Sequence, residues 1–346
     1  MLLFDTPIRL KVNNLIIVYN IFFTTDTIYI ISNNYMTVEK RRLLNLKFKV
    51  NNVAVSHINL FTDHPTHESS NVYKLANTTK ELDKKITVCH NNKEYELMLP
   101  SHKFISYKQD LLTAMTLFKG DYKLIPTYIK HYKSLGIMSF NLYYNYSHEN
   151  LIKLPNMTEI LHNIDMDKDI TCTFMEWNFP YWKIINRQRM HMSQSPAISD
   201  MYYKSKHLYQ NILFNDLDEY IYFNDKEINR FDELLIKYKD EAIFQFNGRW
   251  SKYIVEDKME QNVHNQRGIS YLNFTNTFNM NNFVVSGWPD ARRSKILLKT
   301  NLLGMKIHKA LSQLSSNDDI LKIPYEHKVV GEFHHVHNIL GKYRHK

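Results

Sequence analysis

The sequence has 346 residues, of which 44% are hydrophobic and 23% charged. This composition excludes a disordered or fibrous chain, and the length suggests about two domains. The formal net charge is +9, from 44 Lys and Arg against 35 Asp and Glu. It predicts a polyanionic partner, which is a nucleic acid, an anionic membrane or a phosphate group on a small substrate. The two cysteines, Cys89 and Cys172, exclude a disulfide framework and are typical of a reducing compartment.

No segment has the pattern of a membrane anchor or a secretion signal. The apolar run at residues 15–23 is interrupted by Asn20 and is shorter than the roughly 20 residues that cross a bilayer. It also lacks the charged, apolar and small-residue layout of a signal peptide. We therefore expect a soluble cytoplasmic protein without a membrane span.

Residues 1–108 predict a small β-rich domain of unknown role. Short β-branched and aromatic runs alternate there with polar breaks, and Asn-Asn pairs at 33–34, 51–52 and 91–92 have the composition of turns. The expected strands are 15–18, 27–31, 46–50, 53–60, 86–90 and 95–99.

Residues 109–346 predict an α/β domain with a mainly parallel sheet, because strands and helices alternate there. The expected strands are 115–118, 138–144, 170–175 and 211–214, and the expected helices are 122–135, 147–154 and 197–206. Gly136 has the place of a helix C-cap. Ligands bind beyond the carboxyl ends of such strands, so Lys119, directly after the first of them, is a candidate phosphate ligand.

The segment NILFNDLDEYIYF, residues 211–223, contains the strongest chemical signal. An apolar strand runs into Asp216, Asp218 and Glu219, and three carboxylates at a strand end repel one another unless a cation lies among them. In extended backbone Asp216 and Asp218 point the same way, as two oxygen ligands for Mg²⁺ or Mn²⁺ together with a nucleoside diphosphate. The alternative is an acidic turn between two strands. An EF-hand is excluded, because Ile221 stands where the obligatory Gly belongs.

Residues 215–221, NDLDEYI, resemble the D-x-D-E-[FY] signature of GT-A nucleotide-sugar glycosyltransferases, in particular of glycosyltransferase family 92. Residues 116–147 resemble its opening strand, helix, Leu-Gly-[IV] turn and second strand, and residues 193–206 resemble the Gln-led helix before the metal motif. The pairs at 120–121 and 126–127, Gly-Asp and Pro-Thr, depart from the Asn-Glu and Glu-Trp of relatives. The resemblance implies a GT-A fold, a Rossmann-like and mainly parallel sheet with flanking helices.

The resemblance also implies a metal-dependent, inverting hexosyl- or N-acetylhexosaminyl-transferase. Its donor would be a nucleoside diphosphate sugar, expected to be a UDP-sugar, and its acceptor a glycan or protein. Asp218 would hold Mn²⁺ or Mg²⁺ against the phosphates, and Asp216 would assist the metal or reach the ribose. The implied third ligand is a histidine near the C-terminus: His335 first, then His337 and His308. Residues 333–337 have the alternation of a strand with His335 and His337 on one face.

An inverting transferase needs a carboxylate base beside the acceptor hydroxyl. In the GT-A fold that base lies on a loop leading into a helix, and Asp290 fits this place as the base or merely as an N-cap. Glu256 and Asp257 are the alternative bases. Candidate ligands of the diphosphate follow Asp290 in the sequence: Arg292, Arg293 and Lys295.

Asp200 matches a family position and is a candidate nucleotide ligand, with a surface-helix carboxylate as the alternative. A competing hypothesis for the whole chain is a basic nucleic-acid-binding protein without catalytic activity. It expects basic residues clustered on one face with aromatic residues between them, whereas Lys and Arg are spread along this chain. An inactive relative that serves as a binding module is a third possibility, against which the retained Asp-x-Asp argues.

Overall fold

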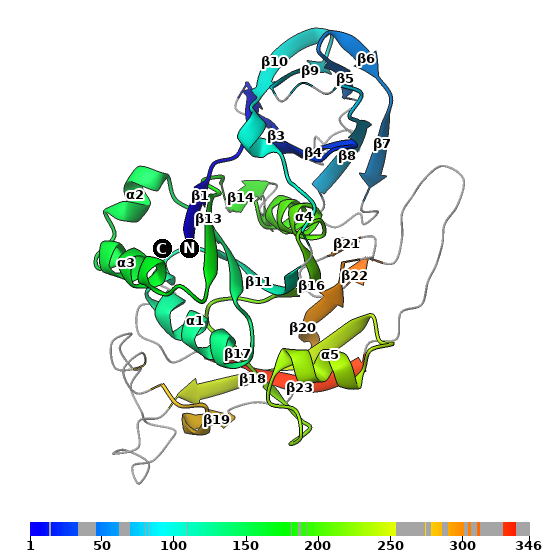
Figure 1. Ribbon diagram of the computed structural model, residues 1–346. Helices are drawn as coiled ribbons and strands as arrows, with labels where there is room; N and C mark the ends of the chain where they lie inside the picture. Colours follow the sequence, from blue (N-terminus) through cyan, green and yellow to red (C-terminus); the bar gives the residue numbers. More distant parts are fainter. Residues whose placement is uncertain are drawn as a thin grey trace.

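The computed structural model describes residues 1–13, 15–33, 46–61, 70–79, 81, 83–108, 110–180, 182–185, 188–191, 193–253, 274, 278–285, 290–300, 304–305, 310–311 and 328–336. A β-rich part, formed by N-terminal residues, lies above a layered α/β part in Figure 1. Two β-hairpins and two short 3₁₀ helices lie outside the main layers: β14 (Trp182–Ile185) with β15 (Gln188–His191), β21 (Gly304–Met305) with β22 (Ala310–Leu311), η1 (Ser101–Lys103) and η5 (Met280–Asn282).

The β-rich part consists of two antiparallel sheets around a shared apolar core. The first has the order β2 (Leu10–Val12), β3 (Leu15–Phe23), β4 (Thr27–Asn33), β8 (Ser70–Ala76), β7 (His57–Phe61). The second has the order β10 (Lys93–Leu99), β9 (Lys84–His90), β5 (Lys47–Val50), β6 (Val53–Val55). Most sequential strands in these sheets are separated by short polar segments. The β-branched and aromatic runs between polar breaks in the sequence therefore predicted most of them.

Two of the Asn-Asn pairs form the expected turns. Asn51 and Asn52 join β5 to β6, and Asn91 and Asn92 join β9 to β10. All four have positive φ angles, between 48° and 69°. Two-residue hairpin loops of type I′ require this conformation, which Asn tolerates better than most residues. The third pair, at 33–34, lies partly outside the described residues.

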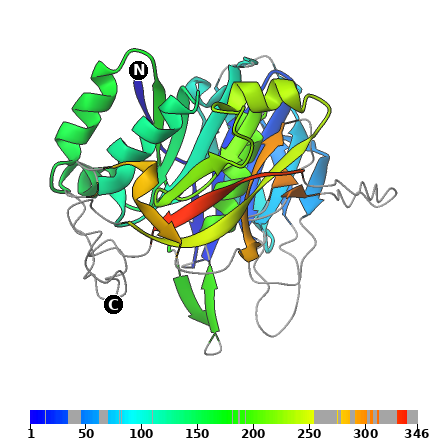
Figure 2. The ribbon, with the colours of Figure 1, turned by 90° about the horizontal axis from the view of Figure 1, so that it is seen from below.

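A ten-stranded sheet forms the centre of the α/β part. Its order is β1 (Leu2–Asp5), β13 (Thr171–Glu176), β12 (Ser139–Tyr144), β11 (Asp110–Phe118), β16 (Tyr209–Phe214), β20 (Asp290–Lys299), β18 (Ile243–Tyr253), β23 (Lys328–Val336), β17 (Glu219–Phe223), with β19 (Phe283–Val285) on β18. The half from β1 to β16 is parallel, as expected. The other half is mixed: β20 is antiparallel to its neighbours β16 and β18, whereas β23 runs parallel to β18, beside it in Figure 2.

The first strand of the chain belongs to this large sheet and not to the β-rich part. Leu2–Asp5 pairs in parallel with β13, with Leu2 opposite Cys172 and Asp5 opposite Met175. The prediction that residues 1–108 all belong to one β-rich domain is therefore wrong for this strand. The chain instead begins at the edge of the large sheet, forms the β-rich part, and returns to the large sheet with β11.

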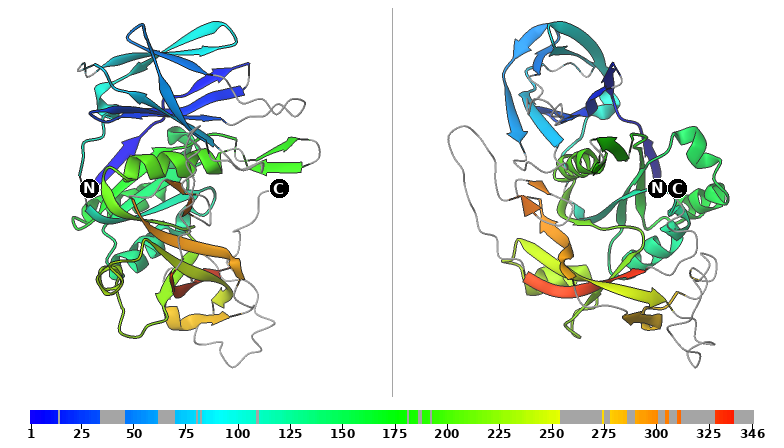
Figure 3. Two further views of the ribbon diagram at one scale, coloured as in Figure 1. Left: turned by 90° about the vertical axis from the view of Figure 1, so that its right-hand side faces the viewer. Right: turned by 180° about the vertical axis from the view of Figure 1, so that it is seen from behind.

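Helices cover both faces of the sheet. They are α1 (Ile125–Ser134, preceded by the 3₁₀ turn η2, Tyr122–Leu124), α2 (His148–Ile152), α3 (Met157–Met166), α4 (Gln194–Ser205) and α5 (Phe231–Lys237). Helix α1 ends before Gly136, whose φ of +93° fits the predicted C-cap. Helix α4 lies between the N-terminal strands and the large sheet (Figures 1 and 3), where its apolar residues share a core with β3, β4 and β11.

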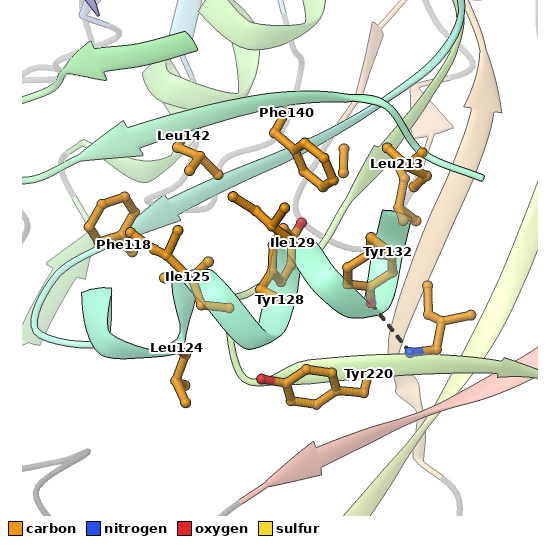
Figure 4. Close-up of a cluster of buried hydrophobic side chains, with 14 of the residues drawn as sticks. Phe118, Leu124, Ile125, Tyr128, Ile129, Tyr132, Phe140, Leu142, Leu213 and Tyr220 are labelled. Atoms are coloured by element: carbon orange, nitrogen blue, oxygen red, sulfur yellow. Dashed lines mark hydrogen bonds between the residues drawn. The ribbon is translucent and has the colours of Figure 1, made fainter. Parts of the chain in front are cut away.

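Helix α1 packs its apolar side against the sheet next to the acidic motif, where the Tyr132 hydroxyl contacts the Glu219 carbonyl at 2.8 Å. Figure 4 shows this cluster, in which the helix side chains face the strands; its labelled members are Phe118, Leu124, Ile125, Tyr128, Ile129, Tyr132, Phe140, Leu142, Leu213 and Tyr220. Tyr132 is fully buried, and its hydroxyl accepts a hydrogen bond from the Ile221 N–H of β17 at 3.3 Å. The helix therefore fixes the position of the strand that follows the acidic residues.

Candidate metal centre

The acidic segment forms a turn between β16 and β17. The Glu219 N–H donates to the Asp216 carbonyl (3.1 Å), and the Asp216 N–H donates to Glu219 Oε2 (2.7 Å). Buried Asn215 supports the turn, since its Nδ2 donates to Tyr132 Oη (2.8 Å) and to the Glu219 carbonyl (3.2 Å). The extended backbone expected from Asp216 to Asp218 is therefore wrong, and these two carboxylates have different neighbours.

Strand β23 brings His335 to this turn. Its Cα partner across the antiparallel pair is Glu219, and the Val336 N–H donates to the Asp218 carbonyl at 3.1 Å. His335 Nε2 lies 3.4 Å from Asp218 Oδ2, and Nδ1 lies 3.5 Å from Glu219 Oε1. Trp250 of β18 lies beside the imidazole, with 4.5 Å between ring centroids. His335 thus lies next to the acidic motif, where a third ligand was expected, and its role as a ligand stays a prediction.

The side chains of Asp218, Glu219 and His335 fit a divalent cation. One potential ligand atom from each lies within 4.8 Å of the others. Two carboxylates and an imidazole are a donor set that proteins use for such ions. Glu219 was not among the metal ligands predicted from the sequence. Asp216 was among them, but its carboxylate instead lies 3.1 Å from Lys295 Nζ.

Lys295 of β20 is an internal counter-ion for the acidic residues. Its Nζ lies 3.1 Å from Asp216 Oδ2 and 2.9 Å from Glu219 Oε2, and its side chain is only 2% exposed. It also lies over the Phe214 ring at 5.6 Å. Lys295 had been considered as a ligand of the diphosphate, but in this structure its ammonium group pairs with the protein's own carboxylates.

Burial and neighbouring charges shift the pKa values of Asp216, Glu219 and Lys295. Partial removal from water raises the pKa of Asp216 to about 6, an effect that Glu219 and Asp218 reinforce and Lys295 opposes. Burial alone would also raise the pKa of Glu219, but Lys295 and His335 hold it well below its ordinary value. Burial alone would lower the pKa of Lys295, but Asp216 and Glu219 raise it instead. The Glu219–Lys295 pair is therefore ionised at neutral pH.

His334, the neighbour of His335, faces away from the acidic cluster. Its ring is stacked between Tyr222 (4.8 Å) and Phe283 (4.9 Å), and its Nδ1 lies 2.5 Å from Ser251 Oγ. Burial lowers its pKa to about 4. Strand alternation thus separates the two histidines, one to the cluster and one to a packed aromatic site.

Asp290 does not precede a helix. It is the first residue of strand β20 and the Cα partner of Gly248 in β18, so the expected loop into a helix and the N-cap role are wrong. The register places its backbone toward the end of the sheet where His335 lies, because Gly248 also pairs with Phe333 of β23. Arg292 and Arg293 follow in the same strand. Four further candidates lie outside the described residues: Glu256, Asp257, His308 and His337.

Asp200 is a buried structural carboxylate and not the surface carboxylate considered as its alternative role. It has no exposed area, and it accepts hydrogen bonds from Asn20 Nδ2 (2.8 Å) and Tyr143 Oη (2.6 Å). Lys204 Nζ lies 3.1 Å from it and 3.2 Å from Asp5. These contacts join the β-rich part, α4 and the large sheet, and they leave the Asp200 carboxylate no surface to offer a nucleotide in this conformation.

Lys119 follows β11 directly and is exposed. Strand β11 is parallel to β16, and the Asn215 N–H, just before the acidic turn, donates to the Met115 carbonyl of β11 at 3.2 Å. Lys119 and the acidic turn therefore follow the carboxyl ends of neighbouring strands, which is the edge where ligands bind in parallel sheets.

The model of glycosyltransferase family 92 matches residues 112–342, which is well over half of the chain and includes the turn, β20 and β23. The chain belongs to glycosyltransferase family 92. Membership supports a glycosyltransferase with a sugar donor and a glycan acceptor, and it favours the enzyme over the nucleic-acid-binding alternative. A comparison with curated proteins found no match.

Among solved structures, the chain is similar to a crystal structure of an apo UDP-glucose pyrophosphorylase, with 9% identity and a TM-score of 0.26. The match covers 66% of this chain and 90% of that one. A likeness this remote has no bearing on the function of the family 92 protein. Among the residues that the structure describes, every helix is too short or too polar to span a bilayer.

Proposed function

We propose that this family 92 protein is a metal-dependent, inverting transferase with a GT-A fold. It moves a hexose or N-acetylhexosamine from a UDP-sugar to a glycan or glycoprotein. The observation that carries the proposal is the meeting of Asp218, Glu219 and His335 at the carboxyl end of β16, beyond the parallel half of the sheet. Donors with charged phosphates are expected at this edge.

Asp218 and His335 would hold Mn²⁺ or Mg²⁺, and Asp216 would complete the site or reach the ribose. A divalent cation bound there would neutralise the negative charge that develops on the diphosphate leaving group. Lys119, Arg292 and Arg293 are proposed to contact the phosphates, where Arg provides paired N–H donors. His337 and His308 remain the alternative histidine ligands.

Asp290 is proposed as the base that takes the proton from the acceptor hydroxyl as the oxygen attacks the sugar. The support for it is its place at the start of β20, toward the same sheet end as His335. Inversion requires the base on the face of the sugar opposite the diphosphate. The anomeric configuration of the product, determined by NMR, tests this step: retention of the donor configuration would contradict it.

The test of the whole proposal is hydrolysis of a panel of UDP-sugars by the full-length protein with Mn²⁺, with and without a chelator. We expect metal-dependent release of UDP from at least one donor, and its loss by at least 100-fold in Asp218→Asn, on the scale by which removal of a positioned charge lowers turnover. Asp240→Asn, at an exposed carboxylate beyond α5, is the matched control and should retain full activity. Metal-independent hydrolysis, or equal turnover by Asp218→Asn, would refute the proposal.

A further inference from the structure

The charged cluster has an inner and an outer layer. Exposed fractions of the side chains rise from 2% for Lys295 and 3% for Glu219 to 9% for Asp218, 18% for His335 and 37% for Asp216. A cation and its phosphate ligand approach from solvent, so they reach the outer side chains first. The two innermost members carry opposite charges and pair with each other at 2.9 Å.

The Glu219 side chain connects the acidic turn to strands β20 and β23, which carry Lys295 and His335. Its Oε2 accepts hydrogen bonds from the Asp216 N–H (2.7 Å) and pairs with Lys295 Nζ (2.9 Å), while its Oε1 faces His335 Nδ1 at 3.5 Å. Both oxygens are thus directed at protein groups. The Glu219 carboxylate can therefore fix the backbone of the acidic turn at Asp216 and the imidazole of His335 at the same time.

His335 has one nitrogen toward each carboxylate, Nε2 toward Asp218 and Nδ1 toward Glu219. A histidine that binds a metal uses one nitrogen for the ion and as a rule donates its other N–H to a carboxylate or carbonyl, which fixes the ring and its tautomer. The more exposed of the two carboxylates, Asp218, lies on the Nε2 side. Glu219 therefore has the position of the carboxylate that orients the ring.

We propose that Glu219 and Lys295 are a positioning pair for the metal site and not part of its ligand set. Glu219 holds His335 Nδ1 and the Asp216 backbone, and Lys295 holds Glu219 and Asp216. This inference rests on the proposed function, because it assumes that a divalent cation binds at Asp218 and His335. It goes further by dividing the acidic signature into ligands and a residue that acts through them.

The test is Mn²⁺ binding to the metal-free, full-length protein, measured by EPR titration without nucleotide. The variants are Glu219→Gln, Lys295→Met, the double variant, and Asp218→Asn as the reference for loss of a ligand. We expect Glu219→Gln and Lys295→Met each to weaken Mn²⁺ binding 10- to 100-fold, the range for partners that orient ligands. The double variant should be no weaker than the worse single one, because the two residues act as a unit.

Donor hydrolysis supplies a second readout. Raised Mn²⁺ concentrations should restore the kcat of Glu219→Gln close to the wild-type value, because its ligands are intact, but should not restore Asp218→Asn. A general structural defect would not respond to Mn²⁺. Thermal midpoints of the metal-free variants identify misfolding, and if Lys295→Met does not fold, the near-isosteric Glu219→Gln decides alone.

The inference is overturned if Glu219→Gln loses Mn²⁺ as completely as Asp218→Asn, since Glu219 would then be a ligand. It is also overturned if Glu219→Gln binds Mn²⁺ as the wild type does, or if the effects of the two single variants add in the double variant. Failure of the wild-type protein itself to bind Mn²⁺ would refute the metal dependence in the proposed function, and this inference with it. The wild-type and variant titrations thus separate the two failures.

Discussion

Glu219 and His335 are direct partners across the antiparallel strands β17 and β23. The acidic signature and the histidine, far apart in the sequence, are therefore held together by the backbone of the sheet before any ion binds. The pairing of these strands should accordingly control both stability and metal affinity, and a glycine that packs against the facing backbone supplies a test.

Gly331 of β23 lies against β17 so closely that a Cβ added there would be 2.3 Å from the Tyr222 carbonyl oxygen. We predict that Gly331→Ala lowers the free energy of unfolding by about 1–3 kcal/mol, as overpacking does, and weakens Mn²⁺ binding because β23 shifts. Urea denaturation and EPR titration measure the two effects. Val329→Ala, at a side chain 47% exposed, is the control in the same strand and should change stability by no more than about 0.5 kcal/mol. Wild-type stability in Gly331→Ala would contradict the prediction.

His335 and His334 should respond in opposite ways to substitution. His335→Asn is expected to weaken Mn²⁺ binding at least tenfold, because it removes the imidazole whose Nε2 lies 3.4 Å from Asp218. His334→Phe retains a ring between Tyr222 and Phe283 but loses the contact with Ser251, so it should cost about 1 kcal/mol of stability and leave Mn²⁺ affinity unchanged. Calorimetric titration and thermal denaturation distinguish them, and the reverse order of metal affinities would refute the assignment of His335.

Asp200→Asn should destabilise the protein by about 1–3 kcal/mol, because it removes the charge of a carboxylate with no exposed area from its pair with Lys204, which retains Asp5 as its other partner. Glu149→Gln removes an exposed ion pair with Lys153 and should change stability by no more than about 0.5 kcal/mol. Chemical denaturation at pH 7 compares the two variants. If Asp200→Asn instead lost UDP affinity at unchanged stability, the nucleotide role predicted from the sequence would be correct.

Stability should fall between pH 6.5 and pH 4 because of His131. This imidazole is buried and its nitrogen Nε2 lies 3.0 Å from the Ile221 carbonyl; burial lowers its pKa from 6.5 to about 4. Below pH 6.5 the unfolded chain takes up a proton that the folded protein does not bind, so stability present above pH 6.5 is progressively lost down to about pH 4. The difference corresponds to about 3 kcal/mol.

Denaturation in the presence of a chelator, repeated from pH 7.5 to pH 4.5, measures this loss. His131→Gln keeps a donor for the Ile221 carbonyl but has no titrating group, so its stability should fall less steeply over the same range. Parallel curves for the two proteins would contradict the prediction, because they would show that His131 takes up its proton over the same pH range in the folded and the unfolded protein.

Local signals explain which parts of the fold were predictable. The Asn-Asn turns and the alternation of strands and helices depend on neighbours in the sequence, and most of them appear in the structure. β20 was missed because the family resemblance placed Asp290 on a loop leading into a helix, whereas tertiary packing makes the residues from Asp290 onward a strand. The continuous run Ile296-Leu297-Leu298 was the available signal: all three are fully buried, on alternating faces of the sheet, as in a central strand.

The same error hid the inner layer of the candidate site. The acidic signature is local and was found, and His335 was selected by a family likeness and a short alternation. Lys295 could be placed beside Glu219 only once β20 was known to pair with β16, because that long-range pairing brings it to the acidic turn. Long-range pairing of this kind leaves no periodic pattern in the sequence.

The position of β1 affects how this protein can be dissected. Leu2–Asp5 covers the outer edge of β13, and Asp5 pairs with Lys204 of α4 at 3.2 Å. A fragment that begins at residue 109 would include every proposed catalytic residue, yet it would expose an unpaired row of β13 backbone N–H and C=O groups. Such edges template aggregation. Insolubility of that fragment would therefore reflect a missing edge strand, and it would say nothing about whether the β-rich part takes part in sugar transfer.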